Sequence, residues 1–155
     1  KIESIIIPEG VTSIGSNAFQ NNSLSDVIIP NNVTDVKSGA FFNNDLTSVS
    51  IGGSVTTLGF NSFRDNELTS ITIPNSVTTI GNNVFKDNTN LSTVNCYTTE
   101  TVLNANLYVF SSTSNPLNLH VRASESCWDS YDDYSITPTE YNFQGNANVR
   151  IFKDL

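Results

Sequence analysis

The stretch LTSITIPNSVTTIGNNVF, residues 68–85, contains the pattern that decides the fold. Its first half alternates, with Ile71 and Ile73 on one side of an extended chain and Ser or Thr on the other, as in a half-buried strand. Pro74 has no backbone N–H and therefore ends that strand. A turn and a second short segment, 77–80, follow, and the apolar ends of this segment are expected to face inward.

The same pattern recurs along the chain every 22 residues. Such a period indicates that each unit is one turn of a solenoid, because a unit of that size buries its apolar face only against neighbouring units. A one-residue insertion near Asn90 shifts the next set to Leu91, Val94 and Cys96. The most regular column is aromatic and consists of Phe19, Phe41, Phe63 and Phe85.

Composition limits the classes of partner. The chain has 155 residues, 37% of them hydrophobic, which suits one domain with a core extended along an axis. Its net charge of -8 opposes binding to phosphate backbones or anionic lipids, so nucleic acid is not an expected partner. No apolar run is long enough to span a bilayer and no signal peptide opens the chain. Because Lys1 falls inside a repeat, we expect a fragment or mature region of a longer exported protein.

Small and polar residues punctuate each unit. Gly81, with Gly at two equivalent positions and Lys37 at the third, suggests a backbone position that favours positive φ. Asn17, Asn61 and Asn83, replaced by Gly39 in the second unit, are expected to cap a single helical turn.

Two polar columns are assigned structural roles. The asparagines should satisfy backbone groups of a tight bend and hydrogen-bond along the column, rather than bind a repetitive ligand. The threonines 12, 34, 56 and 78 should lie on the outer side of a short strand and pack rung upon rung. One such column lacks the second rank that a water-ordering surface needs. The asparagine column comprises Asn22, Asn44, Asn66 and Asn88.

The unit LxxIxIPxxVTxIGxxAFxxN resembles the BspA-type, or Treponema pallidum-type, bacterial cell-surface leucine-rich repeat. The match covers four units from Ile2 to Cys96 and, less regularly, a fifth ending at Leu119 and Val121. The asparagine of the general leucine-rich consensus appears only as Asn32. The resemblance implies a curved, right-handed α/β repeat solenoid with a parallel β-sheet and short helical turns. It also implies export to the cell surface and a role in adhesion or host contact.

After Cys96 the register fails, and we divide the chain into a solenoid, 1–121, and a C-terminal cap and tail, 122–155. The segment SESCWDSYDDY, 124–134, has the aromatic spacing of a helical stripe, so it predicts a helical cap with Trp128 packed on the last rung. Its aromatic residues could instead form a sugar-stacking platform. The alternation around Val149 and Ile151 predicts a strand that pairs with the sheet or leads to a following domain.

No arrangement for catalysis is recognisable, since the chain has one His, two Cys, no phosphate-binding loop and scattered acids. We therefore expect no enzyme, no cofactor and no metal. Zinc binding by Cys96, His120 and Cys127 would have too few ligands, and the aspartates of 129–133 suit a solvated helix face better than a calcium site. A disulfide between Cys96 and Cys127 stays open, because a rung should separate them.

The outward strand positions form the candidate binding surface, because small neutral side chains in parallel rows make a flat hydrogen-bonding face. Two isoleucines interrupt its polarity, either as the start of a protein-contact patch or as side chains covered by preceding repeats or by curvature. The surface comprises Ile6, Ser25, Asp26, Ile28, Thr47, Ser48, Ser50, Thr69, Ser70, Thr72, Thr93 and Asn95.

These features favour a non-catalytic, cell-surface or secreted domain for protein–protein interaction or adhesion, whose partner is a protein or glycan on another cell or matrix. The alternatives are a structural spacer that projects another domain, or a glycan-binding module. The strand around 5–7 would be a sheet edge with free backbone groups. We therefore expect that edge to pair with a second copy, giving a dimer, or to be covered by the tail around Val149 and Ile151.

Overall fold

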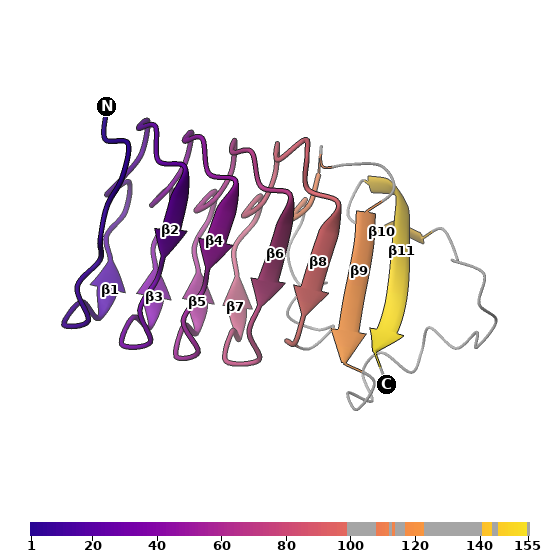
Figure 1. The fold of residues 1–155 in the computed structure, drawn as a ribbon. Coiled ribbons are helices and arrows are strands. Elements are labelled where there is room, and N and C mark those ends of the chain that lie inside the picture. Colours follow the sequence, from indigo (N-terminus) through magenta and orange to yellow (C-terminus); the bar gives the residue numbers. More distant parts are fainter. Residues whose placement is uncertain (99–107, 112, 114–116, 123–140, 144–145, 155) are drawn as a thin grey trace.

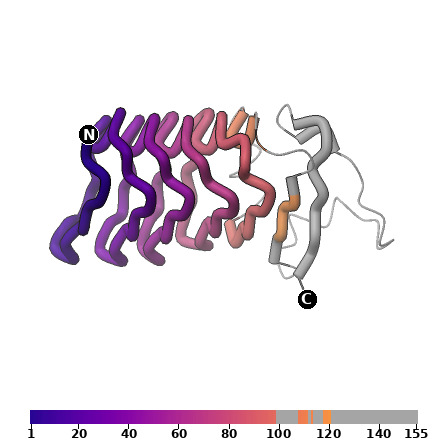
Figure 2. Tube along the Cα trace, turned by 45° about the horizontal axis from the view of Figure 1, so that its top comes forward, coloured from indigo at the N-terminus to yellow at the C-terminus, as the bar shows by residue number. Residues whose placement is uncertain are grey.

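The computed structural model describes residues 1–98, 108–111, 113, 117–122, 141–143 and 146–154. These residues form a solenoid whose turns lie side by side along one axis (Figures 1 and 2). Within these ranges the regular secondary structure consists of β-strands only. The short helical turns that we expected are absent from the described residues, and hydrogen-bonded turns such as those at 15–21 and 59–63 occupy their places.

One side of the solenoid is a row of parallel strands, here called the front sheet (Figure 1). Hydrogen-bond ladders join β2 to β4, β6 to β8, and β8 to β9. β4 and β6 are neighbours without a ladder. The front sheet comprises β2 (Asp26–Ile28), β4 (Ser48–Ser50), β6 (Ser70–Ile73), β8 (Thr93–Cys96) and β9 (Leu117–Arg122).

A second parallel sheet, here called the back sheet, is formed by short strands. The sequence predicted a short strand beside the threonine column of each unit, but not that these strands form a sheet. Its strands pair in the order β1-β3-β5-β7. Each residue lies opposite the residue 22 positions later in the chain, as Ser13 lies opposite Asp35. The inner residue of each strand is buried, as the apolar-polar-polar-apolar pattern predicted. The back sheet comprises β1 (Ser13–Ile14), β3 (Asp35–Val36), β5 (Thr57–Leu58) and β7 (Thr79–Ile80).

A stack of phenylalanine rings runs through the core between the turns. Neighbouring ring centroids are 5.3–5.7 Å apart and the ring planes are within 15° of parallel. Phe41, Phe63 and Phe85 are fully buried, whereas Phe19 at the start of the stack is partly exposed. Phe110 continues the stack, so the degenerate fifth repeat retains its aromatic position despite a wider spacing in sequence.

The asparagine column bonds to the main chain of adjacent turns. Asn66 is 3% exposed; its Oδ1 accepts from the N–H of Leu46, and its Nδ2 donates to the carbonyls of Phe41 and Phe63. Asn44 and Asn88 repeat these contacts one turn before and one turn after. These asparagines therefore bond to backbone groups, and not from one asparagine of the column to the next.

The glycine and asparagine assignments made for the bend were wrong. Positive φ occurs at Asn17, Asn61 and Asn83 (57–60°), and Gly39 in the same column has a φ of 65°. These residues adopt the left-handed conformation of a turn and cap no helix. Gly81 is needed for space instead, because a Cβ there would lie 2.5 Å from the backbone N of Phe60.

The C-terminal tail extends the sheet at the end far from the first repeat. β11 (Asn146–Asp154) pairs in parallel with β9, and β10 (Tyr141–Phe143) pairs antiparallel with β11. This confirms that the segment around Val149 and Ile151 pairs with the sheet, and contradicts the idea that it covers the first rung. The predicted helical cap, including Cys127 and Trp128, lies outside the described residues.

Candidate functional site

The outer face of the front sheet carries the candidate binding residues in two ladders of outward side chains. In one, Asp26 lies opposite Ser48, and in the other Ile28 lies opposite Ser50. Farther along, Thr72 lies opposite Asn95, which in turn lies opposite His120. Of the twelve predicted residues, all are exposed except Thr93 and Asn95, which are half-buried.

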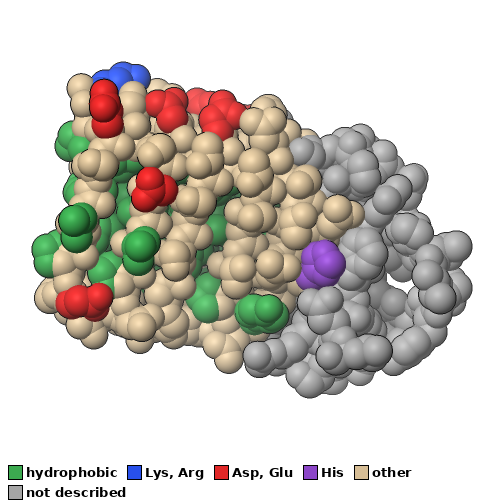
Figure 3. Space-filling view, in the orientation of Figure 1, with side chains coloured by type: hydrophobic (Ala, Val, Ile, Leu, Met, Phe, Trp, Pro, Cys, Tyr) green, Lys and Arg blue, Asp and Glu red, His purple; other side chains and the backbone are tan. Residues whose placement is uncertain are grey.

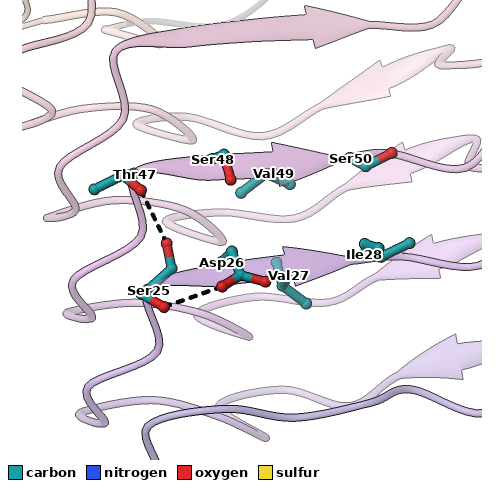
Figure 4. A pocket seen from close by; sticks show the side chains of 8 residues that line it. All are labelled: Ser25, Asp26, Val27, Ile28, Thr47, Ser48, Val49 and Ser50. Carbon is teal, nitrogen blue, oxygen red and sulfur yellow. Dashed lines mark hydrogen bonds between the residues drawn. The ribbon is translucent and has the colours of Figure 1, made fainter.

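A shallow, open groove of about 420 Å³ lies on this face across β2 and β4 (Figure 4). The outward side chains of β4 are both serine, so little rises above the sheet beside the larger Asp26 and Ile28 of β2. Val49 is only half-buried and contributes apolar surface to the lining. The full lining is Ser25, Asp26, Val27, Ile28, Thr47, Ser48, Val49 and Ser50.

The N-terminal part of this face is apolar. Ile28 is 70% exposed and Ile6, one repeat earlier in the same column, is 91% exposed. The 22-residue offset holds in the first repeat, since the N–H of Ser23 bonds to the carbonyl of Ile2 as that of Asp45 bonds to the carbonyl of Leu24. Hydrophobic side chains gather accordingly at the N-terminal end of the face in Figure 3. The curvature of the described turns therefore leaves both isoleucines exposed.

Acidic side chains border the same region. Glu3 and Asp26 project from the face, while Asp45 and Glu67 lie in the bends just before β4 and β6, and all four are exposed. Figure 3 shows most of the acidic groups on this side in a row along one edge of the face. Among the described residues the one ion pair, Arg64 with Asp87 at 2.9 Å, involves none of these four.

Some polar side chains of this face form hydrogen bonds within the protein, and others do not. Thr47 Oγ1 donates to the carbonyl of Ser25 and Asn95 Nδ2 donates to Thr72 Oγ1. Ser25 Oγ donates to Asp26 Oδ1 at 3.0 Å, and this bond orients the carboxylate at the groove (Figure 4). The hydroxyls of Ser48, Ser50 and Ser70 form no such hydrogen bond and are available to a partner.

Sequence reasoning missed the groove lining at Val27 and Val49 and the acidic border at Asp45 and Glu67. The signal for the border was present, because these two acids are one repeat apart. The groove depends on the difference in side-chain size between β2 and β4, and alternation alone does not report that difference.

Within the described ranges, no three His, Cys, Asp or Glu side chains gather in a way that could hold a metal ion. The part of the chain that the structure describes also contains no helix long and apolar enough to cross a membrane. Cys96 is buried at the end of β8.

The comparisons agree with the repeat architecture. The family model for the BspA type leucine rich repeat region matches residues 1–116 in six copies. Comparison with curated proteins and with solved structures finds no significant match.

Proposed function

Because the chain belongs to the BspA-type leucine-rich repeat family, we propose that it is a non-catalytic domain that binds a partner protein on the outer face of its front sheet. Leucine-rich repeat solenoids present extended surfaces made of equivalent positions from successive turns, and such surfaces suit protein recognition. The scattered acids and the single His support a role without catalysis.

The observation that carries the proposal is that the polar side chains of some columns are bonded within the solenoid, whereas the outward serine hydroxyls of β4 in the front sheet are not. Asn44, Asn66 and Asn88 are buried and bonded to neighbouring turns. The threonines of the column at Thr34 and Thr56 are exposed, but their hydroxyls donate to the carbonyls one turn earlier. The outer face of β2 and β4 instead combines free hydroxyls, an exposed carboxylate and exposed isoleucine, which are the groups a partner needs.

The place of action that we propose is the bacterial cell surface or the extracellular space, where the domain would act in adhesion. The family resemblance supports this location. The low proportion of charged residues, 14%, and the rows of Ser, Thr and Asn suit a polar surface that contacts another protein or matrix component.

A blocking substitution tests the face. Ser48→Arg places a long side chain in the groove at a position where the native side chain makes no hydrogen bond. Thr79→Arg is the matched control, since Thr79 is also exposed on a strand but belongs to the back sheet. On an array of extracellular-matrix and surface proteins, we expect Ser48→Arg to abolish binding that the native domain and Thr79→Arg share.

A structural spacer is the rival function, and the continuous ring stack from Phe19 to Phe110 favours it because it stiffens the rod. A domain that binds nothing on the array would support the spacer and contradict our proposal. Binding that survives Ser48→Arg would contradict the outer face of β2 and β4 as the contact surface.

A further inference from the structure

We infer that the segment held across β2 and β4 is an extended, cationic stretch of a partner protein in which Lys or Arg alternates with an aliphatic side chain. This inference rests on the proposed function and specifies the chemistry of its partner. It uses the groove, the exposed isoleucines and the acidic border together.

The distance between Asp26 and Ile28 on β2 sets the spacing of the matching side chains in the partner. Asp26 and Ile28 are two residues apart on one strand, so both side chains project outward about 6.6 Å apart. An extended peptide lying along the groove presents its own side chains i and i+2 at the same interval. A cation at i therefore meets the Asp26 carboxylate when an aliphatic group at i+2 meets Ile28.

The groove offers both contacts on an accessible surface. The small Ser48 and Ser50 leave room beside Ile28, and Val49 adds apolar lining. Ile28 stands between Ile6 and Ser50 in its column, and it is still 70% exposed although turns flank it on both sides. Covering such an isoleucine with an aliphatic side chain is favourable, because it removes apolar surface from water.

The acidic side chains around the groove favour a positively charged partner. Asp26 lies at the groove, and Glu3, Asp45 and Glu67 are exposed around it without an ion pair to any described residue. Like charges brought against such a border cost free energy, whereas Lys or Arg gains attraction and a charge-assisted hydrogen bond to Asp26.

Two other occupants fit less well. A second copy of this chain carries the same net charge of -8 and would bring its acidic border against this one. A glycan usually stacks on aromatic rings, and the outward positions of β2, β4, β6 and β8 carry none.

The test uses three fluorescein-labelled peptides of equal length with the repeating sequences Lys-Thr-Ile-Thr, Glu-Thr-Ile-Thr and Lys-Thr-Ser-Thr. Fluorescence anisotropy measures their affinity for the native domain and for D26N and I28S. The matched controls are E9Q, which neutralises an exposed acid in a turn, and F60S, which removes an apolar side chain that is 49% exposed off this face.

We expect the Lys-Thr-Ile-Thr peptide to bind at least about tenfold more tightly than the other two. I28S should weaken its binding about tenfold and D26N about threefold to tenfold, whereas E9Q and F60S should change it less than about twofold. The affinity should also fall between about 20 and about 300 mM NaCl, because salt screens the carboxylate contact.

Equal binding of the Lys-Thr-Ser-Thr peptide, or equal losses in D26N and E9Q, would mean unspecific attraction to an acidic protein and would overturn the inference. Tighter binding of the Glu-Thr-Ile-Thr peptide would do the same. If the peptides fail while array binding still depends on Ser48, the partner chemistry is wrong and the proposed function stands. Failure of both experiments would overturn both.

Discussion

Replacing Asn66 by alanine should destabilise the solenoid by about 2 kcal/mol, and the hydrogen bonds at this position give the magnitude. The Asn66 side chain accepts one bond, from the Leu46 N–H, and donates to the carbonyls of Phe41 and Phe63. After the substitution Phe41 keeps the donor Asn44, and Phe63 keeps the amide of the next asparagine in the column. The buried Leu46 N–H therefore loses its acceptor, which costs about 1–3 kcal/mol.

Asn66→Asp separates this explanation from a loss of packing. Aspartate restores the acceptor for Leu46 but places a carboxylate against the carbonyls of Phe41 and Phe63. Burial and these carbonyls disfavour the charged form, so the pKa of the new carboxyl should be raised in the folded state. Its protonated form then contributes stability at pH values below the unfolded pKa, and this contribution is lost as the pH rises through the folded pKa.

The assay is urea unfolding followed by far-UV circular dichroism at about pH 4 and pH 7, with Asn22→Ala as the control. Asn22 is only half-buried and its contact, to the N–H of Ile2, is exposed to water, so its loss should cost less than about 1 kcal/mol. Equal costs at Asn66 and Asn22, or an Asn66→Asp variant that does not approach the native stability at pH 4, would refute the reasoning.

Three further pairs of substitutions test the interior and the turns by thermal and urea unfolding. Phe63→Ala should cost about 3–5 kcal/mol because the ring is fully buried between two others, and Phe19→Ala should cost less; a loss below about 1 kcal/mol at Phe63 would contradict the ring register. Gly81→Ala should destabilise by more than about 1 kcal/mol, since its Cβ would meet the backbone of the preceding turn, whereas Gly10→Ala, with open space around it, should stay within about 0.5 kcal/mol of the native protein. Asn61→Ala should lower stability by about 1 kcal/mol and Asn61→Gly should not, because φ there is 57° and the side-chain oxygen has no hydrogen-bond partner to lose; equal effects of the two would exclude the conformational explanation.

The inward columns could be predicted because the strand period is two and the repeat period is 22. A slip of one residue would expose Ile71 and Ile73 and bury Ser70 and Thr72, so only one register is acceptable. The back sheet could not be predicted in the same way. Its strands β1, β3, β5 and β7 have only two residues each. They become a sheet only through pairing with the equivalent strands of adjacent solenoid turns.

The turns show where a column in the sequence was interpreted too simply. Gly59 and Gly81 share their column with Lys37, and a lysine there indicates that positive φ is not the requirement. Gly39 shares its column with Asn61 and other asparagines, which is the combination that left-handed backbone favours. The two columns could have been distinguished by the residue that replaces glycine in each.

The residues of the candidate face could be predicted from the sequence, but the groove on it could not. Alternation identified Ser48 and Ser50 as outward, and it could not show that their small size opens a groove beside Asp26 and Ile28. That property depends on which side chains the parallel register places next to each other, and therefore on the pairing of β2 with β4.

The most direct test of the outer face as the contact surface is a ¹H–¹⁵N NMR titration of the domain with the Lys-Thr-Ile-Thr peptide. The account predicts that amide shifts will concentrate on β2 and β4, around Ile28, Ser48 and Ser50, and leave the back-sheet strands β3, β5 and β7 unchanged. Shifts centred on the back sheet, or spread evenly over the acidic surface, would contradict it.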